Sequence, residues 1–203
     1  MRRLAAALLG AVALALLTGC AGSGRPHIVG GTTLEVSSPD LAAIKAKSDV
    51  PNCPQVSGGQ VDGGMPAVTL PCLGGGRSVD LAGLRGPMIV NFWQAYCGPC
   101  RKEMPALAAY ARSHPSVQVL GVDYLDVQPA AALKLARTSK VAYPLVADPT
   151  GHLAGRRPLT RIPGLPFTAY VDASGRVVHV EAVPMTTVQD VAEAARKYLG
   201  TGG

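Results

Sequence analysis

The chain has 203 residues, of which 48% are hydrophobic and only 4% aromatic. A chain of this length holds one sizeable core, so we expect a single domain after any leader. The formal net charge is +6, but the positive charges are spread along the chain without a basic run. We therefore expect no nucleic-acid partner, and we interpret the cluster of Arg156, Arg157 and Arg161 as a solvated loop.

The start of the chain has the pattern of an export signal. Two arginines precede an apolar stretch over residues 4–17, which is too short to span a bilayer comfortably. The tetrapeptide Leu17-Thr-Gly-Cys20 follows and resembles the bacterial lipobox, which implies cleavage before Cys20 and attachment of lipid to its sulfur. We expect a signal peptide over 1–19 and anchoring to the outer face of the bacterial cell membrane through Cys20. An ordinary secretory signal or an uncleaved anchor is the alternative.

A flexible linker is expected next. Residues 20–39 are rich in Gly, Ser and Thr and have little apolar periodicity. At the end of this segment Ser38 has the character of an N-cap and Pro39 suits the first helical position. We expect a short helix there that ends before Pro51.

The main feature of the sequence is an apolar strand that leads through two cysteines into a helix. Residues 88–93 have the pattern of a strand buried on both faces, and a helix follows from about Gly98. Cys97 then lies at or next to the N-cap, where free backbone N–H groups stabilise a thiolate. Such positions lower the pKa of a thiol from about 8.5 to roughly 3.5–7.5. Cys100, about one turn further on, can attack a mixed disulfide and resolve it.

A CxxC pair can also hold zinc or haem. Zinc needs further ligands at short spacing, but His114 stands alone after the pair, with no second CxxC or closely spaced His pair. Covalent haem attachment needs His directly after the second cysteine, where this chain has Arg101. We therefore interpret the pair as a thiol redox centre and expect neither a metal nor a cofactor.

Short strands and helices alternate before and after this stretch. Strands are expected over residues 65–70, 78–81, 117–122, 143–147, 167–171 and 176–183. Helices are expected over residues 101–113, 129–139 and 187–199. This order predicts an α/β fold.

The segment 91–105, NFWQAYCGPCRKEMP, resembles the thioredoxin superfamily and, more closely, its membrane-tethered extracytoplasmic branch of TlpA/ResA/DsbE-like proteins. The similarity continues through residues 119–126, 143–148, 165–168 and 171–175. It implies a thioredoxin-like fold, with a central mixed sheet flanked by helices and a strand-helix insertion. The domain would cover 40–203, with an N-terminal extension over 40–77 and the core over 78–200.

The resemblance also implies an activity, that of a thiol–disulfide oxidoreductase. Cys97 would exchange disulfides with exported proteins and Cys100 would resolve the mixed disulfide. Within this branch the common role is the reduction of apocytochrome c before haem attachment, with electrons from a membrane partner such as a CcdA/DsbD-like protein. A disulfide-donating oxidant is the alternative direction, and a copper or haem chaperone on the same fold is the alternative of a different class.

A substrate surface is implied as well. Leu165 and Pro166 fall where thioredoxin-like proteins have a cis-proline loop facing the CxxC pair. A cis bond there would expose the backbone of Leu165 to an extended substrate strand. We expect these two residues, together with Trp93 and Tyr96, to contact the substrate.

Asn91 departs from thioredoxin itself, which has a buried aspartate at this place. An amide takes no proton, so proton transfer to Cys100 needs water or another acid. The candidates are Glu103, Asp123 and Asp126, of which we favour Asp126. The alternative for each is a solvated surface carboxylate.

Two cysteines remain, Cys53 and Cys72, in a segment rich in Pro and Gly. In an exported chain they are natural partners, because lipid takes Cys20 and the CxxC takes the other two. We expect a structural disulfide, worth on the order of 3 kcal/mol by the chain-entropy estimate. A second redox relay or two free thiols is the alternative.

Overall fold

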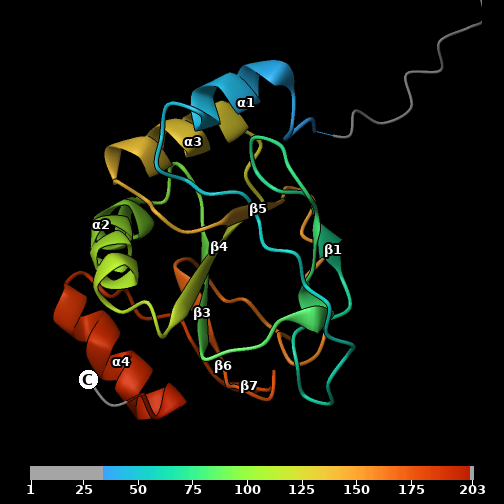
Figure 1. Ribbon diagram of the computed structural model, residues 1–203, viewed down its shortest axis with the longest axis vertical. Coiled ribbons are helices and arrows are strands. Elements are labelled where there is room, and N and C mark those ends of the chain that lie inside the picture. Colours follow the sequence, from blue (N-terminus) through green and yellow to red (C-terminus); the bar gives the residue numbers. More distant parts are fainter. Residues whose placement is uncertain (1–33, 202–203) are drawn as a thin grey trace, which may run out of the picture. The chain divides into compact units, whose positions relative to one another are not determined.

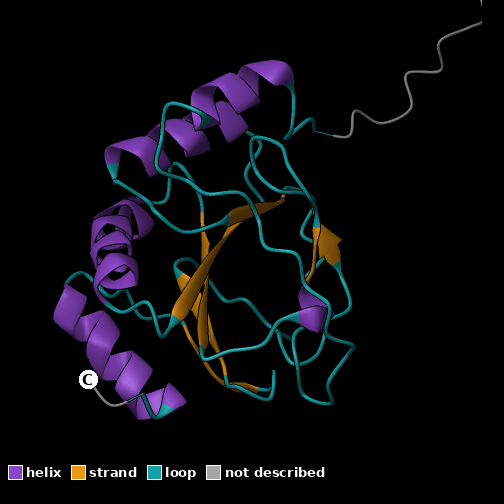
Figure 2. Cartoon of the chain, viewed as in Figure 1, coloured by secondary structure: helices purple, strands orange, loops and turns teal. Residues whose placement is uncertain are grey.

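The computed structural model describes residues 34–201. These residues fold around a central five-stranded sheet (Figures 1 and 2). The predicted signal peptide, the lipidation site at Cys20 and most of the predicted linker lie outside the described residues. The elements in chain order are α1 (Pro39–Lys45), β1 (Thr69–Leu70), β2 (Val79–Asp80), the 3-10 helix η1 (Leu81–Gly83), β3 (Met88–Trp93), α2 (Gly98–Ser113), β4 (Gln118–Tyr124), α3 (Pro129–Thr138), β5 (Leu145–Asp148), β6 (Phe167–Val171), β7 (Val177–Glu181) and α4 (Val188–Leu199).

The central sheet is mixed and has the strand order β5-β4-β3-β6-β7. Strand β3 pairs in parallel with β4, which pairs in parallel with β5. On its other side β3 pairs antiparallel with β6, and β6 with β7. Every residue of β3 is buried, as expected for a central strand with an apolar sequence. The predicted α/β class with a central mixed sheet is confirmed.

Side chains alternate between two cores along the central strand. Ile89 and Trp93 pack into one core together with apolar residues of all four α-helices. Val90 and Phe92 pack into a second core on the opposite face. This period of two follows from strand geometry, and it places Asn91 on the face of the sheet that α2 covers, where it contacts a residue of that helix.

The second face is covered by the N-terminal extension. Figure 1 shows α2 and α4 on one side of the sheet and β1 on the other. Met65, Leu70 and Leu81 lie in the second core, although the strands expected over 65–70 and 78–81 shrink to two residues each. Pro66 explains part of the difference, because a proline cannot donate to a strand ladder.

The extension also covers the edge of the sheet at β5. The backbone N–H of Leu73 donates to Leu145 O at 2.9 Å, and the N–H of Ala147 donates to Pro71 O at 2.9 Å. An exposed strand edge invites pairing with other chains, and these bonds occupy part of this one.

Helix ends agree with the sequence signals. Ser38 caps α1 and accepts from the N–H of Leu41, while Thr187 and Asp190 form a capping box at α4. Helix α2 continues through Pro105. Within residues 34–201 no helix has the length and apolar character that a membrane span requires.

Candidate active site

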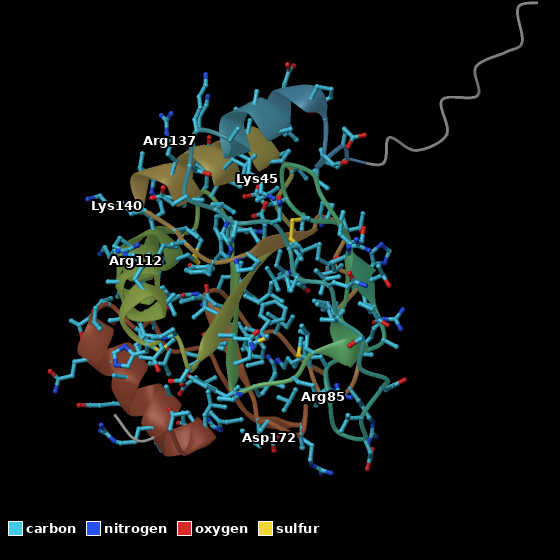
Figure 3. All side chains as sticks on the ribbon, viewed as in Figure 1. Lys45, Arg85, Arg112, Arg137, Lys140 and Asp172 are labelled. Carbon is cyan, nitrogen blue, oxygen red and sulfur yellow. A yellow bond between two sulfur atoms is a disulfide. The ribbon has the colours of Figure 1, made fainter. Side chains whose placement is uncertain are left out.

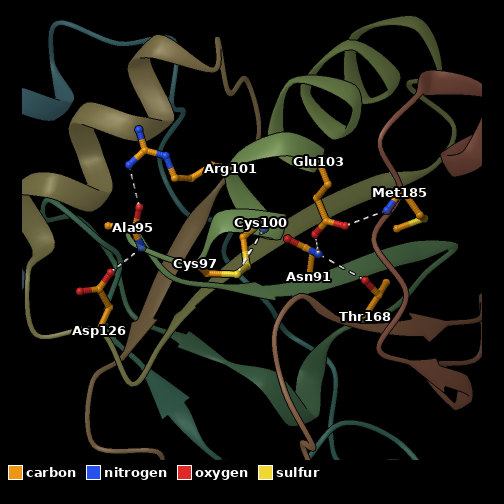
Figure 4. Close-up of a disulfide and its surroundings, with 9 residues drawn as sticks. All are labelled: Asn91, Ala95, Cys97, Cys100, Arg101, Glu103, Asp126, Thr168 and Met185. Atoms are coloured by element: carbon orange, nitrogen blue, oxygen red, sulfur yellow. Dashed lines mark hydrogen bonds between the residues drawn. A yellow bond between two sulfur atoms is a disulfide. The ribbon is translucent and has the colours of Figure 1, made fainter.

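Strand β3 and helix α2 bring the two cysteines of the CxxC together beyond the carboxyl end of the central strand. Cys97 is the N-cap of α2, and its Sγ accepts a hydrogen bond from the backbone N–H of Cys100 at 3.2 Å. The two sulfurs form a disulfide (Figure 4), and the Cα atoms are 5.3 Å apart. The predicted N-cap position is therefore confirmed, and the helix N-terminus directs an N–H group at the sulfur that would carry a negative charge after reduction.

The two sulfurs differ in access. Cys97 is partly exposed, whereas Cys100 has no exposed surface. A molecule from solution can therefore reach Cys97 but not Cys100.

Glu103 lies on the same helix as Cys100 and is fully buried. Its Oε1 accepts from Asn91 Nδ2 at 2.7 Å, and its Oε2 accepts from the N–H of Met185 at 3.0 Å. Burial raises the pKa of this carboxyl to about 7, although the hydrogen bonds from Met185 and Asn91 oppose the shift. The carboxyl therefore changes its protonation near neutral pH, and the alternative of a solvated surface group does not apply to it.

Asp126 lies on the other side of the disulfide in Figure 4. One of its carboxylate oxygens accepts from the N–H of Ala95 at 2.7 Å, and the other accepts from the N–H of Gln128 at 2.7 Å. The carboxylate ties the loop before Cys97 to the loop after β4. Glu103 likewise has both oxygens hydrogen-bonded, and it differs from Asp126 in lying on the same helix as Cys100 with no exposed surface.

Asp123, the third candidate, is buried in the sheet opposite Trp93. Burial raises the pKa of its carboxyl well above the usual range, and the nearby carboxylate of Asp126 raises it further. One of its oxygens has no hydrogen-bond partner in the described part of the chain. Asp123 is therefore not a solvated surface carboxylate.

The expected substrate residues do not all reach the surface. Trp93 has no exposed surface, so its side chain is not accessible to a substrate in this structure. Its position in β3 explains this, because the side chain points into the core under α2. Tyr96 is 65% exposed and stays a candidate.

Leu165 and Pro166 lie at the end of the sheet from which Cys97 follows, because Phe167 pairs with Phe92 in the β6–β3 ladder. The Leu165–Pro166 peptide bond is cis, as the resemblance implied. Leu165 is partly buried and Pro166 is buried. Of these two residues, Leu165 is the more accessible.

A groove of about 240 Å³ opens beside Tyr96. It lies between the start of α2 and helix α3 and is lined by Ala95, Tyr96, Arg101, Ala131, Lys134, Leu135 and Thr138. Leu125 and Val127, on the neighbouring loop, are 47% and 65% exposed. The surface next to Tyr96 thus combines apolar side chains with two basic groups, Arg101 and Lys134.

Three contact residues were not expected from the sequence. Thr168 accepts from Asn91 Nδ2 at 3.2 Å, and Met185 donates its backbone N–H to Glu103. Lys45 lies against the second disulfide, Cys53–Cys72. The spacing of Glu103 three residues after Cys100 was the available sign that the two share one helix face.

The chain matches one protein-family model and is similar to proteins named as thiol:disulfide interchange proteins. The AhpC/TSA family model matches residues 61–180. The Paracoccus denitrificans protein named thiol:disulfide interchange protein DsbE homolog is 37% identical over 100 residues, which are 49% of this chain and 52% of that protein. The Rhodobacter capsulatus protein named thiol:disulfide interchange protein HelX is 35% identical over 123 residues, which are 60% of this chain and 67% of that protein. The chain thus spans about half the length of the first relative.

A solved structure supports the fold. The secreted Mycobacterium tuberculosis disulfide oxidoreductase described as homologous to Escherichia coli DsbE superposes with a TM-score of 0.54 and 21% identity. The match covers 64% of this chain and 93% of that one. The predicted thioredoxin-like fold is confirmed.

Proposed function

We propose that this chain, which belongs to the AhpC/TSA family, is a thiol–disulfide oxidoreductase that exchanges disulfides with exported proteins through Cys97 and Cys100. The observation that carries the proposal is the pairing of a partly exposed sulfur at a helix N-cap with a fully buried sulfur bonded to it. The relatives in Paracoccus and Rhodobacter, both named thiol:disulfide interchange proteins, support it.

The exchange takes two steps. In the reduced enzyme the Cys97 thiolate attacks one sulfur of a substrate disulfide, and the other substrate sulfur leaves with the electron pair of the broken bond. Cys100, as a thiolate, then attacks Cys97 and releases the first substrate sulfur. Two electrons pass from the enzyme dithiol to the substrate disulfide, and the Cys97–Cys100 bond is the product.

Glu103 serves the second step as the proton acceptor. Cys100 must lose its proton before it attacks, and it lies where water has no access. Glu103 is on the same helix three residues later, and its pKa of about 7 suits proton transfer at neutral pH. Asn91 holds the carboxyl in place at 2.7 Å.

The direction we propose is reduction, with the cysteines of apocytochrome c as substrate. The resemblance to the TlpA/ResA/DsbE-like branch supports this role. So does the dipeptide Gly98-Pro99, which thioredoxin shares, and thioredoxin has a potential of about −270 mV. A CcdA/DsbD-like membrane protein would return the electrons, and the groove beside Tyr96 would hold the substrate chain.

Lipid on Cys20 would keep the domain at the outer face of the cell membrane. The tetrapeptide that ends at Cys20 supports this assignment. Metabolic labelling with a radioactive fatty acid tests it: the label should be present in the wild type and absent from Cys20→Ser. Label that persists in the variant would overturn the assignment.

The activity is tested with a disulfide-bonded peptide that carries the Cys-x-x-Cys-His sequence of apocytochrome c. We expect the reduced protein to reduce the peptide, Cys97→Ser to be inactive, and Cys100→Ser to accumulate a mixed disulfide through Cys97. Absence of this adduct would overturn the exchange mechanism. Equilibration of the wild type with glutathione gives the potential of the pair, and a value near that of a strong oxidant, about −120 mV, would reverse the proposed direction.

A further inference from the structure

The second disulfide has a lysine buried against it. Lys45, the last residue of α1, is only 7% exposed. Its Nζ donates to Cys72 Sγ at 3.2 Å and to Gly75 O at 3.0 Å. Figure 3 shows the labelled Lys45 beside a disulfide at the inner side of α1. The ammonium group is thus directed at one sulfur of the Cys53–Cys72 bond.

This ammonium has no anionic partner in the part of the oxidised chain that the structure describes. Among residues 34–201 the single ion pair joins His179 and Glu181. A disulfide sulfur is a weak acceptor, and a buried cation is unfavourable unless a negative group compensates it. Burial accordingly lowers the pKa of Lys45. If the disulfide opens, Cys72 becomes a thiolate at hydrogen-bond distance and supplies the missing negative charge.

The two cysteines of this bond are both buried, but not equally. Cys53 is 7% exposed and follows two exposed residues, Pro51 and Asn52, whereas Cys72 is 1% exposed. A thiol from solution therefore reaches Cys53 more readily. The better leaving sulfur is the one whose thiolate is stabilised, and Lys45 makes that sulfur Cys72.

A hollow of about 360 Å³ opens beside Lys45. Lys45 and Asn52 line it, together with the loop Gly74, Gly75 and Gly76, whose φ values are all positive. A Cβ built on Gly76 would lie 3.7 Å from Cys72 Sγ and 3.8 Å from Asn52 Oδ1. The loop thus brings bare backbone close to the sulfur, and a side chain there would occupy space next to the disulfide.

We propose that Cys53–Cys72 is a second thiol-exchange site, at which a low-molecular-weight thiol attacks Cys53 and Cys72 leaves as a thiolate held by Lys45. The attacking thiolate forms a bond to Cys53 Sγ, and the electron pair of the old bond stays on Cys72. A second thiol molecule attacks the sulfur of the first and releases the Cys53 thiolate. Two thiols are oxidised to one disulfide, and the protein gains the two electrons. Neither Cys97 nor Cys100 takes part, so the site is independent of the function proposed above.

Opening this bond would loosen the extension from the sheet. Cys72 forms an isolated bridge with Val146, and Cys53 Sγ lies 3.2 Å from Leu145 O, both at the edge strand β5. The disulfide ties the segment before β1 to this edge. The concentration of low-molecular-weight thiols around the protein would therefore determine how firmly the extension is attached to the sheet.

The order of the two sulfurs is tested in the full chain carrying Cys97→Ser and Cys100→Ser. The folded protein is treated with 2-mercaptoethanol, quenched with iodoacetamide at short times and mapped by mass spectrometry. We expect mercaptoethanol on Cys53 and the alkyl group on Cys72 in the same molecule. The reverse pattern would overturn the proposal, and so would a bond that stays closed until the protein unfolds.

The role of Lys45 is tested with Lys45→Met and the matched control Lys47→Met, which changes an exposed lysine just after α1. We expect Lys45→Met to slow reduction about tenfold and to move the midpoint of Cys72 alkylation to higher pH by about one unit. The control should behave as wild type. Equal rates and midpoints in all three proteins would overturn the role of the lysine. If Lys45→Met fails to fold, the adduct order in the parent protein still decides the site.

Discussion

Asn91 Nδ2 donates to Glu103 Oε1 at 2.7 Å, so the strand and the helix that position the CxxC pair also share a buried polar contact next to it. The contact joins β3 to α2 inside the core, and neither residue has an exposed surface. An acid held in this way has a fixed position and a raised pKa, and both properties can be tested.

Glu103→Gln should slow the resolving step more than the attacking step. The amide keeps the size of the side chain but cannot accept the proton of Cys100, so we expect resolution at pH 7 to fall by about tenfold to a hundredfold. Stopped-flow tryptophan fluorescence and acid quenching separate the two steps. The pH profile of resolution should lose its inflection near 7. A variant that slows both steps equally at every pH would point to a structural role instead.

Stability should fall as the pH rises through the titration range of Glu103. The pKa of its carboxyl is about 7 in the folded protein, against an ordinary value of 4.5 for a glutamate in water. Between these values the folded protein holds a proton that the unfolded chain has lost, so rising pH favours unfolding, by about 3 kcal/mol over the whole window. Burial also raises the pKa of Asp123. Its carboxyl therefore lowers the stability in the same way once the pH rises above the ordinary pKa of an aspartate.

The measurement is urea unfolding at a series of pH values from about 4 to 8, roughly the range over which these carboxyls titrate. Glu103→Gln should flatten much of the slope, so that its stability relative to wild type improves as the pH rises. A slope unchanged in the variant would show that Glu103 does not titrate in this window.

Asp126→Asn should weaken the loop before Cys97. The amide has one acceptor oxygen in place of two, so it cannot satisfy the N–H groups of both Ala95 and Gln128. We expect a loss of about 1–3 kcal/mol in the free energy of unfolding, together with faster hydrogen exchange at the N–H of Ala95. Asp172→Asn, which changes an acid in the turn between β6 and β7, is the control for a general effect of charge.

Local signals in the sequence predicted much of the fold. Strand β6 has the expected bounds, because its apolar run lies between two turn signals. Cys97 was placed at the N-cap because a strand, a Gly-Pro pair and a helix follow one another within a few residues. The strand, the two cysteines and the helix are contiguous in the chain, so their pattern can be recognised from the sequence alone.

The contacts that the sequence did not reveal join distant segments. Glu103 accepts from Met185, 82 residues away, and Lys45 meets Cys72, 27 residues away. Nothing in the neighbourhood of either residue indicates burial, since acids and lysines are usually exposed. The resemblance implied that Trp93 lines the substrate surface, whereas the alternation of side chains along β3 turns the indole inward.

Local sequence patterns also did not predict which residues cover the second face of the sheet. Residues 51–61 contain no regular element, so no periodicity predicts where they pack. The cis bonds Gly86–Pro87 and Arg157–Pro158 were unexpected too, because the default for such bonds is trans.

Tyr96→Ala should change partner choice and leave the chemistry intact. The ring is 65% exposed and lines the groove beside the disulfide. We expect kcat/KM for the apocytochrome peptide to fall about tenfold, through loss of apolar contact, while the reaction with a small aromatic disulfide stays near the wild-type rate. Equal losses with both substrates would mean that Tyr96 positions Cys97 rather than the peptide.

Removal of the Cys53–Cys72 bond should destabilise the domain without altering the potential of the active pair. The bond closes a loop with a sequence separation of 19, so the chain-entropy estimate gives a loss of about 3 kcal/mol in Cys53→Ala/Cys72→Ala. Denaturant unfolding measures the loss, and glutathione equilibration measures the potential of Cys97–Cys100. The stability should change without a change in the potential, because the second disulfide lies at the edge strand β5, whereas the active pair follows the central strand β3. A shift in the potential comparable to the change in stability would mean that the extension and the active site are coupled through the sheet.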